Sequence, residues 1–106
     1  MVYINSYDKE FNTLYIYRKE EKIKFSIEVL DNFILDIGFK GTAVGIEILD
    51  ASKILKVSKD QLENIKNSSI STIIKNQGIV VFIQMEFPKT KIESQIAIPA
   101  ATMLRK

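Results

Sequence analysis

Apolar and polar residues alternate along most of this chain, in short runs rich in isoleucine, valine and aromatic residues. In residues 24–29, for example, Phe25, Ile27 and Val29 alternate with lysine, serine and glutamate. Alternation with a period of two is typical of β-strands that bury one face. The pattern predicts strands over residues 2–5, 13–18, 24–29, 33–38, 43–49, 69–75, 79–87 and 92–98.

The alternation stops near Asp50, and helix signals take its place. The sequence Ser-Lys-Asp-Gln at 58–61 matches a capping box, in which the first and fourth side chains satisfy free backbone N–H groups. It predicts one short helix over residues 59–67. Asp50 is predicted to cap a separate helical turn, because an aspartate carboxylate accepts from the free N–H groups at a helix start.

The fold class that these elements predict is mainly β, or β-rich α+β. Consecutive strands with short connections favour antiparallel neighbours, so we expect an antiparallel meander that forms either a two-sheet sandwich or one curled sheet. The 106 residues fit a single domain, with no linker or low-complexity segment in the sequence. Residues 1–57 are predicted to form the β meander, and residues 58–106 to add the helix and a three-strand antiparallel extension that shares the core.

The chain contains no cysteine and no histidine, which narrows its chemistry. Disulfides, thiolate metal sites, cysteine nucleophiles and Ser-His-Asp triads are excluded. Any reaction would therefore depend on carboxylates, lysine, tyrosine, serine or threonine, and we expect no cofactor. The net charge of +2 comes without a basic block, so we expect no nucleic-acid partner.

The apolar runs and the N-terminus argue against a membrane. The N-terminus lacks the basic start and apolar run of a signal peptide. The longest apolar stretch, residues 79–83, is far too short to cross a bilayer. We expect a cytoplasmic protein with no membrane partner.

Several short motifs in the first half resemble those of a known family. They are Tyr7-Asp8, Thr-Leu-Tyr-Ile at 13–16, Ile-Leu-Asp at 34–36, and Val-Gly-Ile-Glu-Ile-Leu-Asp-Ala-Ser at 44–52. Over residues 1–57 the chain resembles the small prokaryotic domain of unknown function numbered twenty-two eighty-three. The resemblance implies a small β-rich module without an assigned activity. It also implies a partner-binding or antitoxin role, because some members occur beside small toxin-like proteins.

Turn lengths predict the strand register, because a shift of one residue would turn every apolar side chain outward. They set Ser26 opposite both Tyr15 and Asp36, and Gly45 opposite Asp36. One set of side chains then lies on the solvent side of the sheet and forms a candidate interaction face. It comprises Tyr15, Tyr17, Ser26, Glu28, Asp36, Gly45 and Glu47.

This candidate face combines small residues with tyrosines and carboxylates. Gly38, Ala43 and Gly45 leave a floor with little side-chain bulk, whereas Val44 is predicted to point into the core. Glycine in the middle of a strand often marks close approach by another backbone or a ligand. Tyrosine is enriched in interface cores.

We therefore expect a non-enzymatic protein-interaction module, either a homo-oligomer or an antitoxin-like partner of another small protein. In that case a bulky residue at Gly45 should disrupt association and leave the fold intact. The alternative is a small-ligand or carbohydrate enzyme that uses Asp36 with Glu28 or Glu47, because carboxylate pairs catalyse glycoside hydrolysis. An ordinary solvated strand face is the third interpretation.

Overall fold

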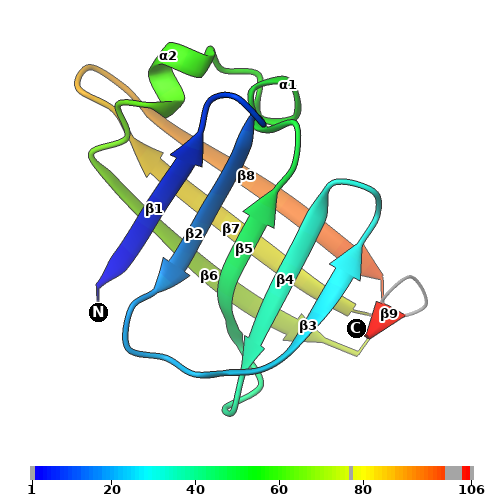
Figure 1. The fold of residues 1–106 in the computed structure, drawn as a ribbon. Coiled ribbons are helices and arrows are strands. Elements are labelled where there is room, and N and C mark those ends of the chain that lie inside the picture. The colour runs from blue at the N-terminus through cyan, green and yellow to red at the C-terminus, as the bar shows by residue number, and fades with distance from the viewer. Residues whose placement is uncertain (1, 77, 100–103, 106) are drawn as a thin grey trace.

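The computed structural model describes residues 2–76, 78–99 and 104–105, which form two antiparallel sheets and two short helices (Figure 1). The larger sheet has the strand order β1-β2-β5-β4-β3-β9, and the smaller has the order β6-β7-β8. The larger sheet comprises β1 Tyr3–Asp8, β2 Thr13–Arg18, β3 Ile23–Val29, β4 Phe33–Gly38, β5 Ala43–Ile48 and β9 Leu104–Arg105. The smaller sheet comprises β6 Asn67–Lys75, β7 Gly78–Glu86 and β8 Lys91–Pro99. The predicted antiparallel, strand-rich fold is confirmed.

The order of strands in the larger sheet differs from the predicted meander. β2 pairs with β1 and β5, so Tyr15 lies opposite Glu47 and not opposite Ser26. The connection between β2 and β3 crosses the end of the sheet, past β5 and β4 (Figure 1). Alternation along a strand determines which face is buried but not which strand lies beside it, so this pairing was predicted wrongly. The predicted pairs of Asp36 with Ser26 and with Gly45 are confirmed.

A β-bulge in β5 interrupts the predicted alternation at Ala43 and Val44. Asp36 pairs with Gly45 and Ile37 pairs with Ala43, which leaves Val44 as an extra residue. Ala43 therefore joins the core, and Val44 packs beside Gly38, where a Cβ would lie 2.8 Å from Val44 Cγ1. An extra residue in one strand reverses the faces beyond it, so the predicted solvent-side position of Ala43 was wrong. Val44 is buried as predicted, at 3% exposure, but it lies outside the main hydrophobic cluster.

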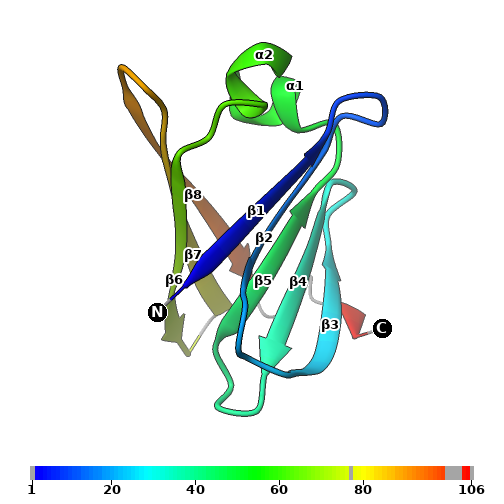
Figure 2. The same cartoon turned by 60° about the vertical axis from the view of Figure 1, so that its left-hand side comes forward.

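One hydrophobic cluster draws on both sheets and both helices. Leu14, Ile16 and Leu35 from the larger sheet are completely buried, as are Val81 and Ile83 from the smaller one. Figure 2 shows the two sheets as facing layers, with the helices across the open end between them. Burial of apolar surface at roughly 25 cal/mol per Å2 makes this cluster the main source of stability.

The two helices are α1 Ala51–Leu55 and α2 Lys59–Leu62. The capping box of α2 is confirmed: Ser58 Oγ accepts from Gln61 N at 3.0 Å, and Gln61 Oε1 accepts from Ser58 N at 3.1 Å. The predicted helix over 59–67 was too long, because Asn67 already pairs with Glu86 as the start of β6. No helix in the described ranges is long and apolar enough to cross a membrane.

The start of α1 is capped from a distant turn. Asp50 has left-handed backbone geometry (φ 55°) and makes no side-chain cap, contrary to the prediction. Asn12, between β1 and β2, replaces it: its backbone O accepts from Ala51 N at 2.8 Å and its Oδ1 accepts from Ser52 N at 3.1 Å. The turn between β1 and β2 therefore fixes the point where the chain leaves the larger sheet.

Candidate functional site

A hydrogen-bond network spans four strands on the outer face of the larger sheet. Tyr15 Oη on β2 donates to Asp36 Oδ2 on β4 at 2.5 Å. Ser26 Oγ on β3 donates to Asp36 Oδ1 at 2.6 Å. Both carboxylate oxygens therefore accept from hydroxyl groups, and Asp36 is 6% exposed, the one charged residue among those described that is buried. Burying an unpaired carboxylate costs free energy, and two hydrogen bonds from hydroxyl groups offset that cost for Asp36.

The network depends on the glycine in the intervening strand. β5 lies between β2 and β4, and the Tyr15 side chain reaches Asp36 across Gly45. A Cβ at position 45 would lie 2.8 Å from Asp36 Oδ2 and 3.2 Å from Tyr15 Oη. Gly45 therefore belongs to the network, as the residue that leaves room for it. The expectation that a bulky residue there would leave the fold intact is not supported by this geometry.

The two tyrosines of β2 form a stacked pair. Their ring centroids are 4.7 Å apart with an angle of 23° between the planes. Tyr17 lies opposite Gly45, so its ring stands beside a position without a side chain. Burial, reinforced by the hydrogen bond to Asp36, raises the pKa of the Tyr15 hydroxyl well above its usual value. Tyr15 is therefore a neutral donor at physiological pH, held in one orientation.

The structure brings most of the predicted face together. Four of its residues meet in the network, and Tyr17 stacks on one of them. Glu47 lies opposite Tyr15 and is half-buried, whereas Glu28 is exposed and lies opposite Ile34. The network residues are Tyr15, Ser26, Asp36 and Gly45.

A hollow beside the tyrosines was not predicted. It has a volume of about 340 Å3 and lies over β1, β2 and β5. Phe11, in the turn after β1, contributes its side chain, and this residue is 73% exposed. The lining residues are Ser6, Asp8, Phe11, Thr13, Tyr15 and Glu47. The register of β1 with β2 was not predicted from the sequence. This pairing places Ser6 opposite Tyr15 and Asp8 opposite Thr13, and so forms the hollow.

The arrangement favours a positioning role for Asp36 over a catalytic one. A general base needs a free oxygen within reach of a substrate proton, and both oxygens of this buried carboxylate already accept hydrogen bonds. Within the described part of the chain, no three metal-ligating side chains are grouped so that they could hold a metal ion. What the face offers to a ligand is a pair of ordered aromatic rings bordered by carboxylates.

The fold and this face define a small β-rich domain with an ordered tyrosine pair. Residues 6–52 match the model of a family described as a protein of unknown function, DUF2283. The chain belongs to this family, and the resemblance drawn from its motifs is confirmed. All seven residues of the predicted face lie inside the matched segment.

Two curated archaeal proteins are similar to the chain. A Methanosarcina mazei protein that bears the name "Putative hypoxanthine phosphoribosyltransferase" is 35% identical over 83 residues, which cover 78% of this chain and 67% of that protein. An uncharacterised protein of Methanocaldococcus jannaschii is 40% identical over 72 residues, which cover 66% of this chain and 61% of that protein. The chain thus spans less than two thirds of the second relative and about two thirds of the first. No solved structure matches it significantly.

Proposed function

We propose that this chain is a non-enzymatic protein-interaction module, and that the tyrosine face is its docking surface. We define the tyrosine face as Tyr15, Tyr17, Ser26, Glu28, Asp36, Gly45 and Glu47 together with the adjacent hollow. The observation that carries the proposal is the stacked tyrosine pair, anchored through Tyr15 on a buried carboxylate.

Ordered aromatic rings make efficient contact surfaces. Tyrosine supplies a large contact area and has few side-chain torsions to immobilise, so binding orders little that is not already ordered. Here the hydroxyl of Tyr15 is fixed by Asp36, and Tyr17 is fixed by stacking on Tyr15. The energetic centre of an interface usually consists of such anchors.

The charges around the rings select the partner. Asp8 and Glu47 line the hollow, and Glu28 is exposed on the outer side of the same sheet. We propose a partner protein that presents a basic side chain, because a guanidinium group can pair with a carboxylate and stack on Phe11 or Tyr15. This is the antitoxin-like form of the predicted role, in which another small protein is the ligand. We place it in the cytoplasm, because small secreted domains usually carry disulfides and this sequence has no cysteine.

Paired affinity captures test the proposal. The tagged chain and its Tyr17→Ala variant would be expressed in the source cells, and chains that co-purify in near-equal amounts would be identified. We expect a basic protein with the wild type that is lost with Tyr17→Ala. Ile73→Ala is the control, because Ile73 is 46% exposed on β6, in the other sheet. A partner that the folded Tyr17→Ala variant retains would overturn the proposal, whatever the control does.

Two considerations point to an enzyme. The name of the Methanosarcina relative refers to a transferase, and an enzyme is the sequence-based alternative to an interaction module. No specific observation favours an enzyme. Asp36, the central carboxylate of the enzymatic alternative, is buried, and both of its oxygens already accept hydrogen bonds. We expect calorimetric titration of this chain with hypoxanthine to give no heat of binding. Saturable binding would reopen an enzymatic interpretation.

A further inference from the structure

The four edges of the two sheets are covered to different degrees. The edges of β1 and β6 meet at one corner, where Tyr3 Oη donates to Ile70 O at 2.7 Å and Asn5 Nδ2 donates to Ser68 Oγ at 3.3 Å. The edge of β3 is paired with β9. In the described part of the chain, β8 has β7 as its one neighbouring strand. An open edge presents a row of backbone donors and acceptors to another chain.

β8 is well formed for pairing. It has nine residues, and its register with β7 runs without a bulge from Lys91 to Pro99. Bulges, and prolines inside an edge strand, are common ways to prevent edge-to-edge association. The stretch 91–98 contains neither, and its two charged residues are Lys91 at its start and Glu93.

The centre of β8 is self-complementary in the antiparallel direction. Its sequence is Ile92-Glu93-Ser94-Gln95-Ile96. A second copy paired about Ser94 would place Ile92 opposite Ile96 and Glu93 opposite Gln95, each twice. The isoleucines lie on the core side and are half-buried against the hydrophobic cluster. Glu93 and Gln95 are exposed on the outer side. Apolar side chains would therefore meet on one side, and a carboxylate would meet an amide on the other.

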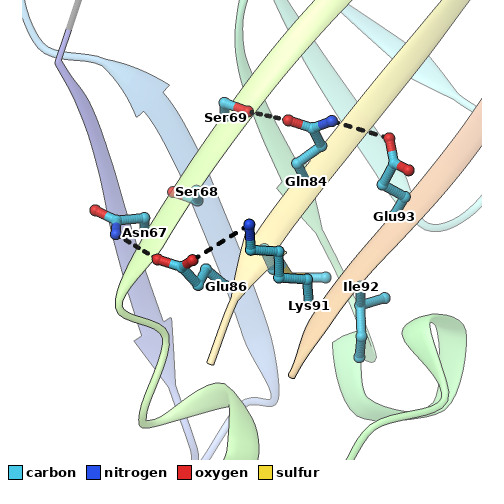
Figure 3. A pocket seen from close by; sticks show the side chains of 9 residues that line it. Asn67, Ser68, Ser69, Gln84, Glu86, Lys91, Ile92 and Glu93 are labelled. Atoms are coloured by element: carbon cyan, nitrogen blue, oxygen red, sulfur yellow. Dashed lines mark hydrogen bonds and ion pairs between the residues drawn. The ribbon is translucent and has the colours of Figure 1, made fainter. Parts of the chain in front are cut away.

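A ladder of side chains already leads to this edge. Ser69 Oγ donates to Gln84 Oε1 at 3.2 Å, and Gln84 Nε2 donates to Glu93 Oε1 at 2.9 Å (Figure 3). These bonds cross β6, β7 and β8 on the wall of a surface hollow of about 410 Å3. The amide of Gln95 from a second copy would continue the ladder by donating to Glu93, as Gln84 does from within the chain.

We propose that two copies of this chain pair antiparallel through β8, with the twofold axis at Ser94. The three-stranded sheets then join into one sheet of order β6-β7-β8-β8-β7-β6. The pairing covers the open edge and brings the half-buried Ile92 of each copy against Ile96 of the other. This interface goes beyond the proposed function, because it uses the smaller sheet and leaves the tyrosine face free for a different partner.

Two charge substitutions at Gln95 test the pairing, because they should change the dimer affinity in opposite directions. Gln95→Glu places two like-charged pairs across the interface and should weaken the dimer about tenfold. Gln95→Lys places two opposite-charged pairs there and should strengthen it by a few fold. Ser71→Glu is the matched control, because Ser71 is exposed in the same cross-strand row, on β6, two strands from the interface. It should leave the dimer affinity unchanged.

The readout is the solution mass over a dilution series from about 1 μM to about 1 mM. The mass should rise from 12.1 kDa towards twice that value. Tyr17→Ala should dimerise as the wild type does, which separates this proposal from the docking role of the tyrosine face. A mass of 12.1 kDa at every concentration would overturn the proposal, as would a dimer that responds equally to Gln95→Glu and Ser71→Glu.

A single cysteine tests the register directly, because the native sequence has none. Directly opposite residues of antiparallel strands have Cα atoms about 4.5–5.5 Å apart, which a disulfide can bridge. Ser94→Cys should therefore form a covalent dimer on mild oxidation, and Ser71→Cys should not. Cross-linking of Ser71→Cys but not of Ser94→Cys would contradict the pairing.

Discussion

Tyr15 Oη lies 2.5 Å from Asp36 Oδ2, although β5 runs between the strands that carry these two residues. The contact passes over Gly45, and Ser26 completes it from the far side at 2.6 Å. β2, β4 and β3 are thereby joined through side chains as well as through the backbone, and the contact crosses β5 at a residue that has no side chain. Because Tyr17 stacks on Tyr15, the same contact also orders the second ring of the proposed docking surface.

Gly45→Ala should destabilise the fold by about 2 kcal/mol, because its Cβ would overlap the carboxylate and overpacking typically costs this much. The contact that decides this is the 2.8 Å distance from the Cβ position to Asp36 Oδ2. Urea unfolding measures the effect. In an Asp36→Ala background the same change should cost much less, since the crowding atom is absent. An equal cost in both backgrounds would show that position 45 acts independently of the network.

Tyr15→Phe should lower the free energy of unfolding by about 1–2 kcal/mol, because it removes a hydrogen bond to a charged acceptor and leaves one oxygen of Asp36 unsatisfied. Tyr17→Phe is the matched control, since its hydroxyl makes no hydrogen bond with the described residues. It should change stability by less than about 0.5 kcal/mol. Equal losses in the two variants would mean that the bond between Tyr15 and Asp36 contributes nothing specific.

The stability difference between the wild type and Tyr15→Phe should depend on pH. Burial, then the bond to Asp36, raises the pKa of Tyr15 in the folded state, whereas an unfolded tyrosine titrates near pH 10. The contribution of the hydroxyl is therefore fully present below about pH 10 and is lost as the pH rises towards the folded value. Unfolding midpoints at about pH 8, 10 and 11 should show a constant difference at first and a shrinking one afterwards. A difference that grows above pH 10 would contradict the assignment.

Asn12 is expected to be the most sensitive turn residue outside the network. Besides capping α1, its Oδ1 accepts from Tyr7 Oη at 2.6 Å and its Nδ2 donates to Ser52 Oγ at 2.8 Å. Asn12→Ala should cost about 2 kcal/mol or more, because caps contribute about 1 kcal/mol and the left-handed backbone (φ 54°) disfavours alanine.

Asn12→Gly separates these two contributions to the stability of the turn. Glycine relieves the backbone strain but not the loss of hydrogen bonds, so it should be about 1 kcal/mol less harmful than alanine. Thermal unfolding of both variants gives the comparison. Wild-type stability in Asn12→Gly would mean that the side-chain bonds contribute nothing.

The sequence predicted the parts of the face that depend on short hairpins. The tight connections between β3, β4 and β5 leave little freedom of register. Asp36 was therefore placed correctly, opposite Ser26 on β3 and opposite Gly45 on β5. The neighbour of β2 was not predictable in this way, because Leu14 and Ile16 would be buried equally well beside β3 or beside β5. Because of that ambiguity, the hydrogen bond from Tyr15 to Asp36 across Gly45 was not predicted.

Two further differences arise where the local pattern is ambiguous. Ala43 and Val44 are both suited to a buried position, so alternation gave no sign that Val44 is the extra residue of a bulge. The capping box marked the start of α2 correctly, but the end of a short helix depends on the next element in the chain. Here α2 ends at Leu62, and Asn67, which the predicted helix included, begins β6 opposite Glu86.

The most direct test of the docking role is an equilibrium titration of the captured partner, once purified, against the wild type, Tyr17→Ala and Ile73→Ala. Loss of an anchor ring from an interface centre typically weakens binding at least about thirtyfold. We expect that loss for Tyr17→Ala, with its fold retained by circular dichroism, and wild-type affinity for Ile73→Ala. Unchanged affinity of folded Tyr17→Ala would contradict the claim that the tyrosine face is the docking surface.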